Sequence, residues 1–218
     1  MRQNYEKEME DTIARLEREG KTPTVLLHSC CAPCSSAVLE RLTPRFRVTV
    51  FYYNPNIDPP AEYQKRVREQ RRFLDACRTV TPAEMIEGPY EPEEFDRIAR
   101  GMEAEPEGGA RCMRCYALRL RRTAERARAD GFDYFTTTLS VSPYKNARAL
   151  NEIGGRLAAE YGVPYLYSDF KKKDGYMRSI RLSGEYGLYR QNFCGCRYSR
   201  LAREAECAAK ENHSAEQP

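Results

Sequence analysis

Short strand-like segments alternate with amphipathic helical segments along most of the chain. Between the strand-like segments lie helical patterns, the clearest at 113–130, where the apolar residues share one face and Gly131 ends the pattern. Strands that alternate with helices indicate an α/β fold around a mostly parallel sheet. The strand-like segments occupy residues 24–27, 48–53, 83–87, 132–139 and 164–167.

The whole chain is interpreted as a single domain with short appendages. A charged helical pattern occupies residues 1–22, and the polar end of the chain, 211–218, is predicted to be disordered. Residues 23–210 then form the catalytic α/β domain, a Rossmann-like fold in which helices flank a mostly parallel sheet. Within it, the basic segment 171–193 is predicted to be irregular and a last helix is predicted at 197–210.

Four loops of unusual composition follow predicted strands. The carboxyl ends of parallel strands lie at one edge of a sheet, and ligands of α/β folds bind at that edge. These loops are therefore predicted to share one site. Their sequences are HSCCAPCS at 28–35, NPN at 54–56, SPYK at 142–145 and SDFKKK at 168–173.

The chain carries nine cysteines. Whether they are expected to form disulfides depends on whether the protein resides in an oxidising or a reducing compartment. The amino-terminal segment lacks the apolar core of a signal peptide, and no apolar run approaches the roughly 18 residues of a membrane span. We therefore expect a cytoplasmic protein without membrane association. In a reducing compartment, an odd number of cysteines favours metal binding or redox chemistry over structural disulfides.

Two pairs of cysteines have the spacing of a metal site. Cys30 and Cys31 lie in the loop after the first strand, and Cys112 and Cys115 lie at the start of the clearest helix. Four thiolates suit an iron–sulfur cluster or a zinc ion, and spacing alone does not separate the two. The adjacent pair in a strand-to-helix loop favours a reactive cluster over structural zinc.

Three further cysteines stand outside these pairs. Cys34 lies near a helix start, where the helix dipole would lower the pKa of its thiol. It is a candidate fifth ligand, a ligand to a second metal or a packing residue. Cys77 and Cys207 lie on helical patterns and are predicted to pack as small apolar residues.

Cys194 and Cys196 are separated only by Gly195 and form a candidate redox pair. A disulfide across one glycine closes a small, strained ring, and strained disulfides are the readily reduced ones. The glycine permits the backbone bend that such a ring requires. Two unconnected thiols or two more metal ligands are the alternatives.

Basic residues concentrate between residues 171 and 200. Eight basic and two acidic residues give this segment a net charge of +6, whereas the whole chain carries +4. A local basic patch suggests a polyanionic partner, and a solvated charged face is the alternative. The eight residues are Lys171, Lys172, Lys173, Arg178, Arg181, Arg190, Arg197 and Arg200.

Five segments match, in order, the motifs of one family. They are HSCCAPCS (28–35), NPNIDPPAEY (54–63), GGARCMRCYALRLRRTA (108–124), FTTTLSVSPYK (135–145) and the segment 167–196, which begins YSDFKKKDGY and ends RQNFCGC. Together they resemble the epoxyqueuosine reductases of the QueH type. The resemblance covers roughly residues 24–200, and it is the joint occurrence of the motifs that is specific.

This resemblance implies an iron–sulfur oxidoreductase whose partners are tRNA carrying epoxyqueuosine and an electron donor that the sequence does not identify. Members of the family reduce epoxyqueuosine at the wobble position to queuosine without cobalamin. The implied 4Fe-4S ligands are Cys30, Cys31, Cys112 and Cys115, the implied redox pair is Cys194 and Cys196, and the candidate ligands of an implied second iron are Cys34 and Asp169.

A tRNA substrate gives roles to basic and aromatic residues of the chain. Basic side chains would contact phosphates, and tyrosines would stack on unpaired bases, with core packing as the alternative for each tyrosine. Asn54 and Tyr63 are candidates to face the substrate, whereas His28 is interpreted as a structural histidine. The candidate tRNA contacts are Lys171, Lys172, Lys173, Arg178, Arg181, Arg190 and Tyr144, with Tyr176, Tyr186 and Tyr189 as further candidates for stacking.

Two other functions are compatible with parts of the pattern. An ATP-dependent tRNA thiolase on a similar fold would need a glycine-rich phosphate loop after the first strand. That place holds HSCCAPCS, which has no glycine, so ATP is not expected as a cofactor. A zinc-stabilised RNA-binding module would explain Cys112, Cys115 and the basic segment, but it leaves Cys194 and Cys196 without a role.

Overall fold

The fold is built on a four-stranded parallel sheet, as predicted. The computed structural model describes residues 3–215 of the chain. The strand order is β3-β2-β1-β4, and in the ladder Leu27 lies opposite Val50 on one side and Thr136 on the other. The strands are β1 (Thr24–His28), β2 (Arg47–Tyr52), β3 (Glu84–Glu87) and β4 (Tyr134–Thr137).

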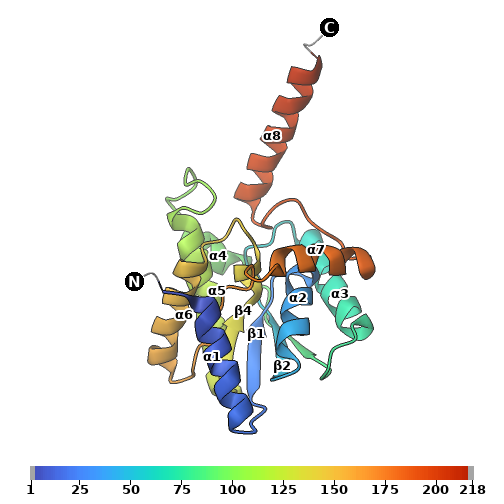
Figure 1. The fold of residues 1–218 in the computed structure, drawn as a ribbon. Coiled ribbons are helices and arrows are strands. Elements are labelled where there is room, and N and C mark those ends of the chain that lie inside the picture. Colours follow the sequence, from blue (N-terminus) through green and yellow to red (C-terminus); the bar gives the residue numbers. More distant parts are fainter. Residues whose placement is uncertain (1–2, 216–218) are drawn as a thin grey trace.

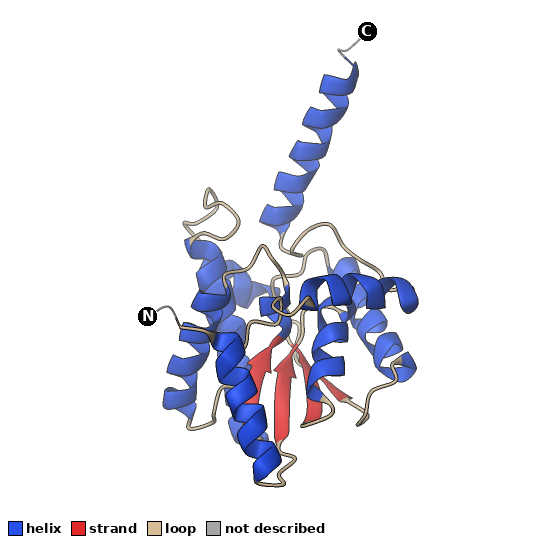
Figure 2. Cartoon of the chain, in the orientation of Figure 1, coloured by secondary structure: helices blue, strands red, loops and turns tan. Residues whose placement is uncertain are grey.

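Helices cover both faces of the sheet, so the central strands are buried on both sides (Figures 1 and 2). Successive residues of β1 point to opposite faces: Val25 and Leu27 join the core beneath α1 and α2, and Leu26 joins the core beneath α5 and α6. The first face carries α1 (Tyr5–Arg18), α2 (Ala32–Leu42) and α3 (Pro60–Ala76), and the second carries α4 (Pro92–Ala99), α5 (Ala110–Asp130) and α6 (Ala147–Tyr161).

The predicted strand at 164–167 is reduced to a single bridge between Phe135 and Tyr165. The side-chain amide of Asn151 accepts a hydrogen bond from the backbone N–H of Ser168 and donates one to its carbonyl. The bridge itself consists of two bonds, from the N–H of Phe135 to the carbonyl of Pro164 and from the N–H of Leu166 to the carbonyl of Phe135, and Ser168 beyond it bonds to Asn151. The segment still runs parallel to β4, so the loop after it reaches the same edge as the loops after β1 and β2.

The prediction that 171–193 is irregular is wrong, because α7 (Gly175–Glu185) lies within it. The helix packs across α2 (Figure 1). Ser179, Leu182 and Ser183 are buried at helical spacing, so one face is small and apolar enough to pack closely. The many basic residues of the segment conceal this short stripe in the sequence.

The last helix, α8 (Arg197–Ala215), projects away from the body at the carboxyl edge of the sheet (Figure 1). It continues beyond the predicted end at residue 210, and residues 216–218 of the predicted tail lie outside the described residues. Cys207 is exposed on this helix, so its predicted packing role is wrong, whereas Cys77 does pack against the core. Among residues 3–215, no helix combines the length and hydrophobicity that a membrane span requires.

Candidate metal and redox site

Three cysteine thiols lie together where β1 ends and α2 begins. Cys30 and Cys31 occupy the short connection, and Cys34 lies in the first turn of α2. The three sulfur atoms are all within 4.8 Å of one another, and the Sγ atoms of Cys30 and Cys31 are 3.7 Å apart. Cys30 and Cys31 are buried and Cys34 is half-buried. Such a group of soft donors suits a thiophilic metal.

Of the three thiols, that of Cys30 ionises most readily. Hydrogen bonds from Cys31 and Cys34 hold the pKa of Cys30 well below its usual range, with the charge of Arg119 adding to the effect. The hydrogen bond with Cys30 and burial raise the pKa of Cys31 to about 12, and hydrogen bonds with Cys30 and Cys31 raise that of Cys34 well above its usual range. The prediction that the helix start lowers the pKa of Cys34 is wrong, because the neighbouring thiols and burial dominate.

A buried arginine, Arg119 of α5, ties this loop to the sheet. Its Nε donates to His28 Nε2 at 3.2 Å, and its Nη2 donates to Asn54 Oδ1 at 2.5 Å. The other ring nitrogen of His28 lies 2.8 Å from Thr137 Oγ1, and Asn54 Nδ2 donates to the carbonyl of Ser29 at 2.9 Å. Burial and the Arg119 charge lower the pKa of His28 to about 3, so this histidine is a neutral structural residue, as predicted.

Cys112 and Cys115 lie in the first turns of α5, three residues apart and therefore on neighbouring positions of its surface. Burial raises the pKa of Cys115 to about 11, and the half-buried Cys112 accepts a hydrogen bond from the N–H of Gly108 at 3.3 Å. Neither belongs to the 4.8 Å group of the first loop. The cysteines of α5 and those of the first loop nevertheless act on the same side chain, because Cys115 and Cys30 both raise the pKa of Arg119.

Cys194 and Cys196 enter the same region from the segment between α7 and α8. Lys145 Nζ donates to Cys194 Sγ at 3.2 Å. The Cys196 thiol and this ammonium group hold the pKa of Cys194 well below its usual range, whereas the pKa of Cys196 is raised. Both are free thiols. Cys196 packs beside Cys115. Gly195 has φ +120°, a backbone conformation that favours glycine, as expected for the bend between the two thiols.

Lys145 is a buried cation that the sequence patterns did not single out. Its side chain is 8% exposed, and its Nζ lies 3.8 Å from Glu107 and 5.9 Å from the centre of the Tyr116 ring. Burial and the neighbouring Cys194 raise the pKa of Glu107. The sequence offered one indication of its role, because Lys145 ends SPYK, a loop already predicted to lie at the site. Arg119 could have been noticed in the same way, because it follows the motif of Cys112 and Cys115.

The basic residues of 171–200 are largely paired with acidic groups of the fold. Lys171 pairs with Asp169 at 2.7 Å and Arg181 with Asp174 at 2.7 Å. Arg178 bridges α2 and α7 through Glu40 and Glu185, and Lys173 pairs with Glu10. Arg190 donates to Ser183 Oγ at 3.0 Å, whereas Lys172 is exposed. Arg197 and Arg200 pair with Asp96 and Asp58, so four carboxylates distant in sequence, those of Glu10, Glu40, Asp58 and Asp96, compensate much of the local charge of +6.

A cavity of about 870 Å³ lies beside this segment, lined by the amino ends of α1 and α6 and by Lys171, Lys172 and Lys173. Asp169 lines this cavity, and its carboxylate is held by Lys171. The sulfur group of the first loop therefore does not include Asp169 in this arrangement.

The predicted aromatic contacts separate into exposed and buried residues. Tyr144 is 77% exposed in the loop before α6. Tyr186 packs edge-on against Phe73, and Tyr176 also contacts the core. Tyr189 donates to Glu62 and lies beneath Lys65. Asn54 and Tyr63 are buried, so their predicted position facing the substrate is wrong: Asn54 supports the cysteine loop and Tyr63 packs against Tyr52.

Comparison with known proteins identifies relatives over most of the chain. A family model described as "Epoxyqueuosine reductase QueH" matches residues 25–202. A protein of that name from Staphylococcus epidermidis is 43% identical over 202 residues, which are 91% of this chain and 85% of the relative. Those from Streptococcus pyogenes and Thermotoga maritima are 42% and 39% identical, and the alignments cover 90% and 87% of this chain and 78% and 98% of the relatives.

Replacing Arg119 with methionine is expected to lower the free energy of unfolding by about 1–3 kcal/mol for each of two acceptors left unpaired, on His28 and Asn54. Arg121→Met is the matched control, because that side chain lies on the same helix and is 46% exposed. It should change the free energy by less than about 0.5 kcal/mol. Urea denaturation of both variants at pH 7 measures the difference, and equal effects would contradict the role of Arg119.

Proposed function

The chain belongs to the epoxyqueuosine reductase QueH family, and we propose that it reduces epoxyqueuosine to queuosine at the wobble position of tRNA. The observation that carries the proposal is the meeting of three cysteine-bearing segments around buried cations at one edge of the sheet. Cys34 and Cys112 pack against the cluster that contains Cys30 and Cys31, and Cys115 packs in one cluster with Cys196. Thiolate-bound metal and a dithiol can supply electrons for a reduction, whereas a non-enzymatic RNA-binding module has no use for such a group.

A 4Fe-4S cluster is assigned to Cys30, Cys31, Cys112 and Cys115. The donor chemistry supports the assignment, because all four are thiols and Cys30 already favours its thiolate form. Cys34 and Asp169 are the candidate ligands of a proposed second iron. Cys34 is supported by its place within 4.8 Å of two cluster ligands, and Asp169 by motif position alone. When bound, iron supplies Lewis-acid activation of the epoxide oxygen and transfer of single electrons.

Cys194 and Cys196 are proposed to balance the two-electron change. Conversion of an epoxide to an alkene and water consumes two electrons and two protons, and oxidation of two thiols to one disulfide releases the same number of each. The Cys196 thiol and Lys145 favour the thiolate of Cys194, so this pair itself releases two electrons and one proton, and the solvent supplies the second proton. An external electron donor must then reduce the disulfide after each turnover. The scheme uses neither cobalamin nor ATP.

The tRNA is proposed to bind along the carboxyl edge of the sheet and the neighbouring basic segment. Lys172 and Tyr144 are both exposed. Phosphate groups would compete with Glu10, Asp169 and the other acidic partners for the remaining cations, because exposed ion pairs are weak. The remaining candidates are Lys171, Lys173, Arg178, Arg181 and Arg190.

Deletion of the gene is expected to leave epoxyqueuosine in bulk tRNA where queuosine would otherwise occur, because the last reduction would be missing. Mass spectrometry of nucleosides from digested tRNA measures both. Expression of the chain from a plasmid should restore queuosine. A deletion strain with unchanged queuosine and no epoxyqueuosine would reject the proposed reaction.

Cys112→Ser is expected to remove most of the cluster from anaerobically purified protein, because a hydroxyl is a poor substitute for a soft thiolate ligand. The readout is iron content together with the broad absorbance of iron–sulfur centres near about 400 nm. Cys77→Ser is the matched control and should retain both. A colourless wild-type protein that contains zinc would reject the cluster altogether.

Cys194→Ser is expected to abolish multiple turnover while leaving the cluster absorbance intact, because the variant cannot form the Cys194–Cys196 disulfide. Cys207→Ser, which changes an exposed thiol on α8, should keep wild-type turnover. Queuosine formed per enzyme on epoxyqueuosine-containing tRNA is the measurement. Sustained turnover by Cys194→Ser would remove the dithiol from the scheme.

A further inference from the structure

Arg66 of α3 is a buried arginine that has one unsatisfied hydrogen-bonding group. Its side chain is 1% exposed. Its Nε donates to Glu62 Oε1 at 2.7 Å, and its Nη1 donates to the backbone carbonyl of Cys194 at 3.2 Å. Its Nη2 has no hydrogen-bond partner among residues 3–215. A buried donor without a partner lowers stability, so this N–H group requires an explanation.

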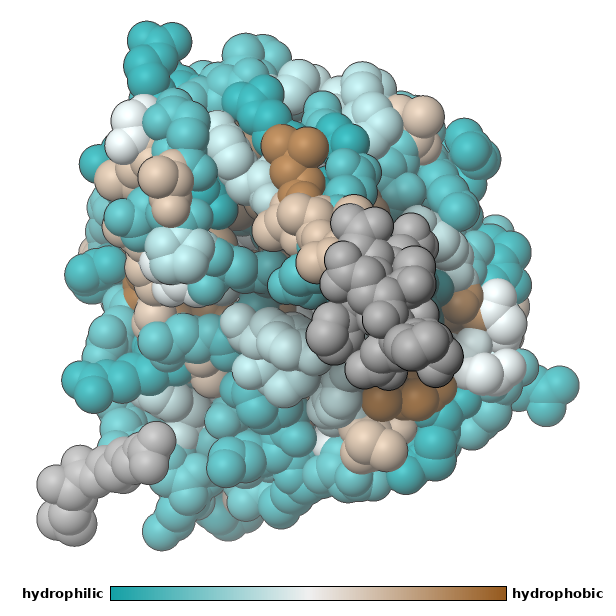
Figure 3. Space-filling model, turned by 90° about the horizontal axis from the view of Figure 1, so that it is seen from above, coloured by the Kyte–Doolittle hydropathy of each residue, from teal (hydrophilic) through white to brown (hydrophobic). Residues whose placement is uncertain are grey.

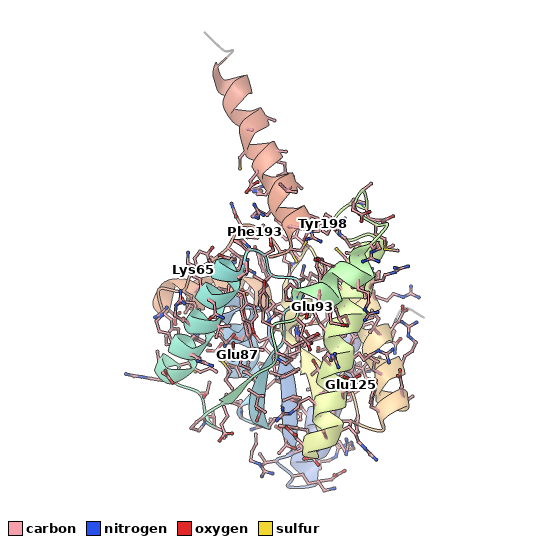
Figure 4. The ribbon with its side chains drawn as sticks, turned by 180° about the vertical axis from the view of Figure 1, so that it is seen from behind. Lys65, Glu87, Glu93, Glu125, Phe193 and Tyr198 are labelled. Carbon is pink, nitrogen blue, oxygen red and sulfur yellow. The ribbon has the colours of Figure 1, made fainter. Side chains whose placement is uncertain are left out.

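The guanidinium of Arg66 lies between the two sulfur-bearing loops. One turn further along α3, Gln70 Oε1 accepts hydrogen bonds from Ser29 Oγ at 2.9 Å and Ser35 Oγ at 3.1 Å, so this face of the helix contacts the loop that carries Cys30 and Cys31. On the other side, a Cβ atom on Gly195 would come within 3.0 Å of Arg66 Nη1, and the ring centre of Phe193 lies 5.2 Å from Arg66 Cζ. Figure 4 shows Phe193 between the start of α3, near Lys65, and the base of α8, near Tyr198.

Arg119 differs from Arg66 in this respect. Its Nε and Nη2 both donate to the polar network of His28 and Asn54, and no atom of Arg119 is left unsatisfied within the described part of the chain. Arg119 therefore has a sufficient structural role. Arg66 is likewise buried and charged, but one of its N–H groups has no partner among residues 3–215.

We infer, building on the proposed function, that Arg66 is a positioning residue that donates this free N–H to a sulfur of the metal centre held by Cys30 and Cys31. A hydrogen bond and a positive charge both favour the more negative, reduced state of an iron–sulfur centre. Arg66 thereby raises its reduction potential. The same guanidinium holds the carbonyl of Cys194, so it also fixes the redox pair relative to the centre.

The test is a reductive titration of anaerobically purified holoenzyme, followed by absorbance and electron paramagnetic resonance. Arg66→Gln should shift the midpoint to a more negative value, lowering the ratio of reduced to oxidised centre about tenfold at the wild-type midpoint, or about 59 mV for one electron. Arg66→Lys keeps the charge and should retain most of the wild-type potential. Arg71→Gln, on the same helix at a 59% exposed position, should leave the potential unchanged.

The outcomes separate this inference from the proposed function. A wild-type potential in Arg66→Gln overturns the role of Arg66 and leaves the reductase proposal standing. Equal shifts in Arg66→Gln and Arg71→Gln, or loss of iron from both Arg66 variants with a native unfolding temperature, also overturn it. A wild-type protein that holds no iron–sulfur centre overturns both proposals. If Arg66→Gln fails to fold, Arg66→Met takes its place, and a midpoint shifted to a more negative value supports the inference whereas a wild-type midpoint overturns it.

Discussion

The buried guanidinium of Arg119 joins the sheet to the sulfur groups at its carboxyl edge. A charged side chain loses hydration when it is buried, and the loss must be offset by hydrogen bonds or opposite charge. Here His28 from β1 and Asn54 from the loop after β2 provide acceptors, and nearby thiols provide charge in their ionised form. Displacing any of these elements would leave a buried cation unpaired, so the site and the sheet edge constrain each other.

The same principle extends to three buried or nearly buried cations, Arg66, Arg119 and Lys145. Each is hydrogen-bonded within the cysteine-bearing segments or next to them: Arg66 donates to the carbonyl of Cys194, Arg119 to the ring of His28, and Lys145 to the thiol of Cys194. Interior cations stabilise thiolates, which are both the metal-binding and the nucleophilic form of cysteine. The interior therefore supplies positive charge, which would stabilise the thiolates of an iron–sulfur centre and of a redox pair.

At the surface, in contrast to the interior, positive charges are paired with carboxylates. Ion pairs with Glu10, Glu40 and Asp174 compensate much of the positive charge that is concentrated in the sequence between residues 171 and 200. Seen from above, the molecule is mostly hydrophilic, with separate small hydrophobic spots (Figure 3). Recognition of tRNA would then depend on exchange of exposed ion pairs for phosphate contacts, which makes binding sensitive to salt.

The sequence by itself determined the parallel α/β fold and the cysteine-bearing loops, because strand and helix periodicity and local motif spacing are properties of neighbouring residues. Only the tertiary structure decided that Cys34 joins Cys30 and Cys31, that Lys145 meets Cys194, and that 175–185 forms a helix on α2. It also decided that Asn54, a candidate to face the substrate, is buried and supports the cysteine loop. These outcomes depend on contacts between residues far apart in the chain, and burial makes each contact strong enough to set charge and conformation.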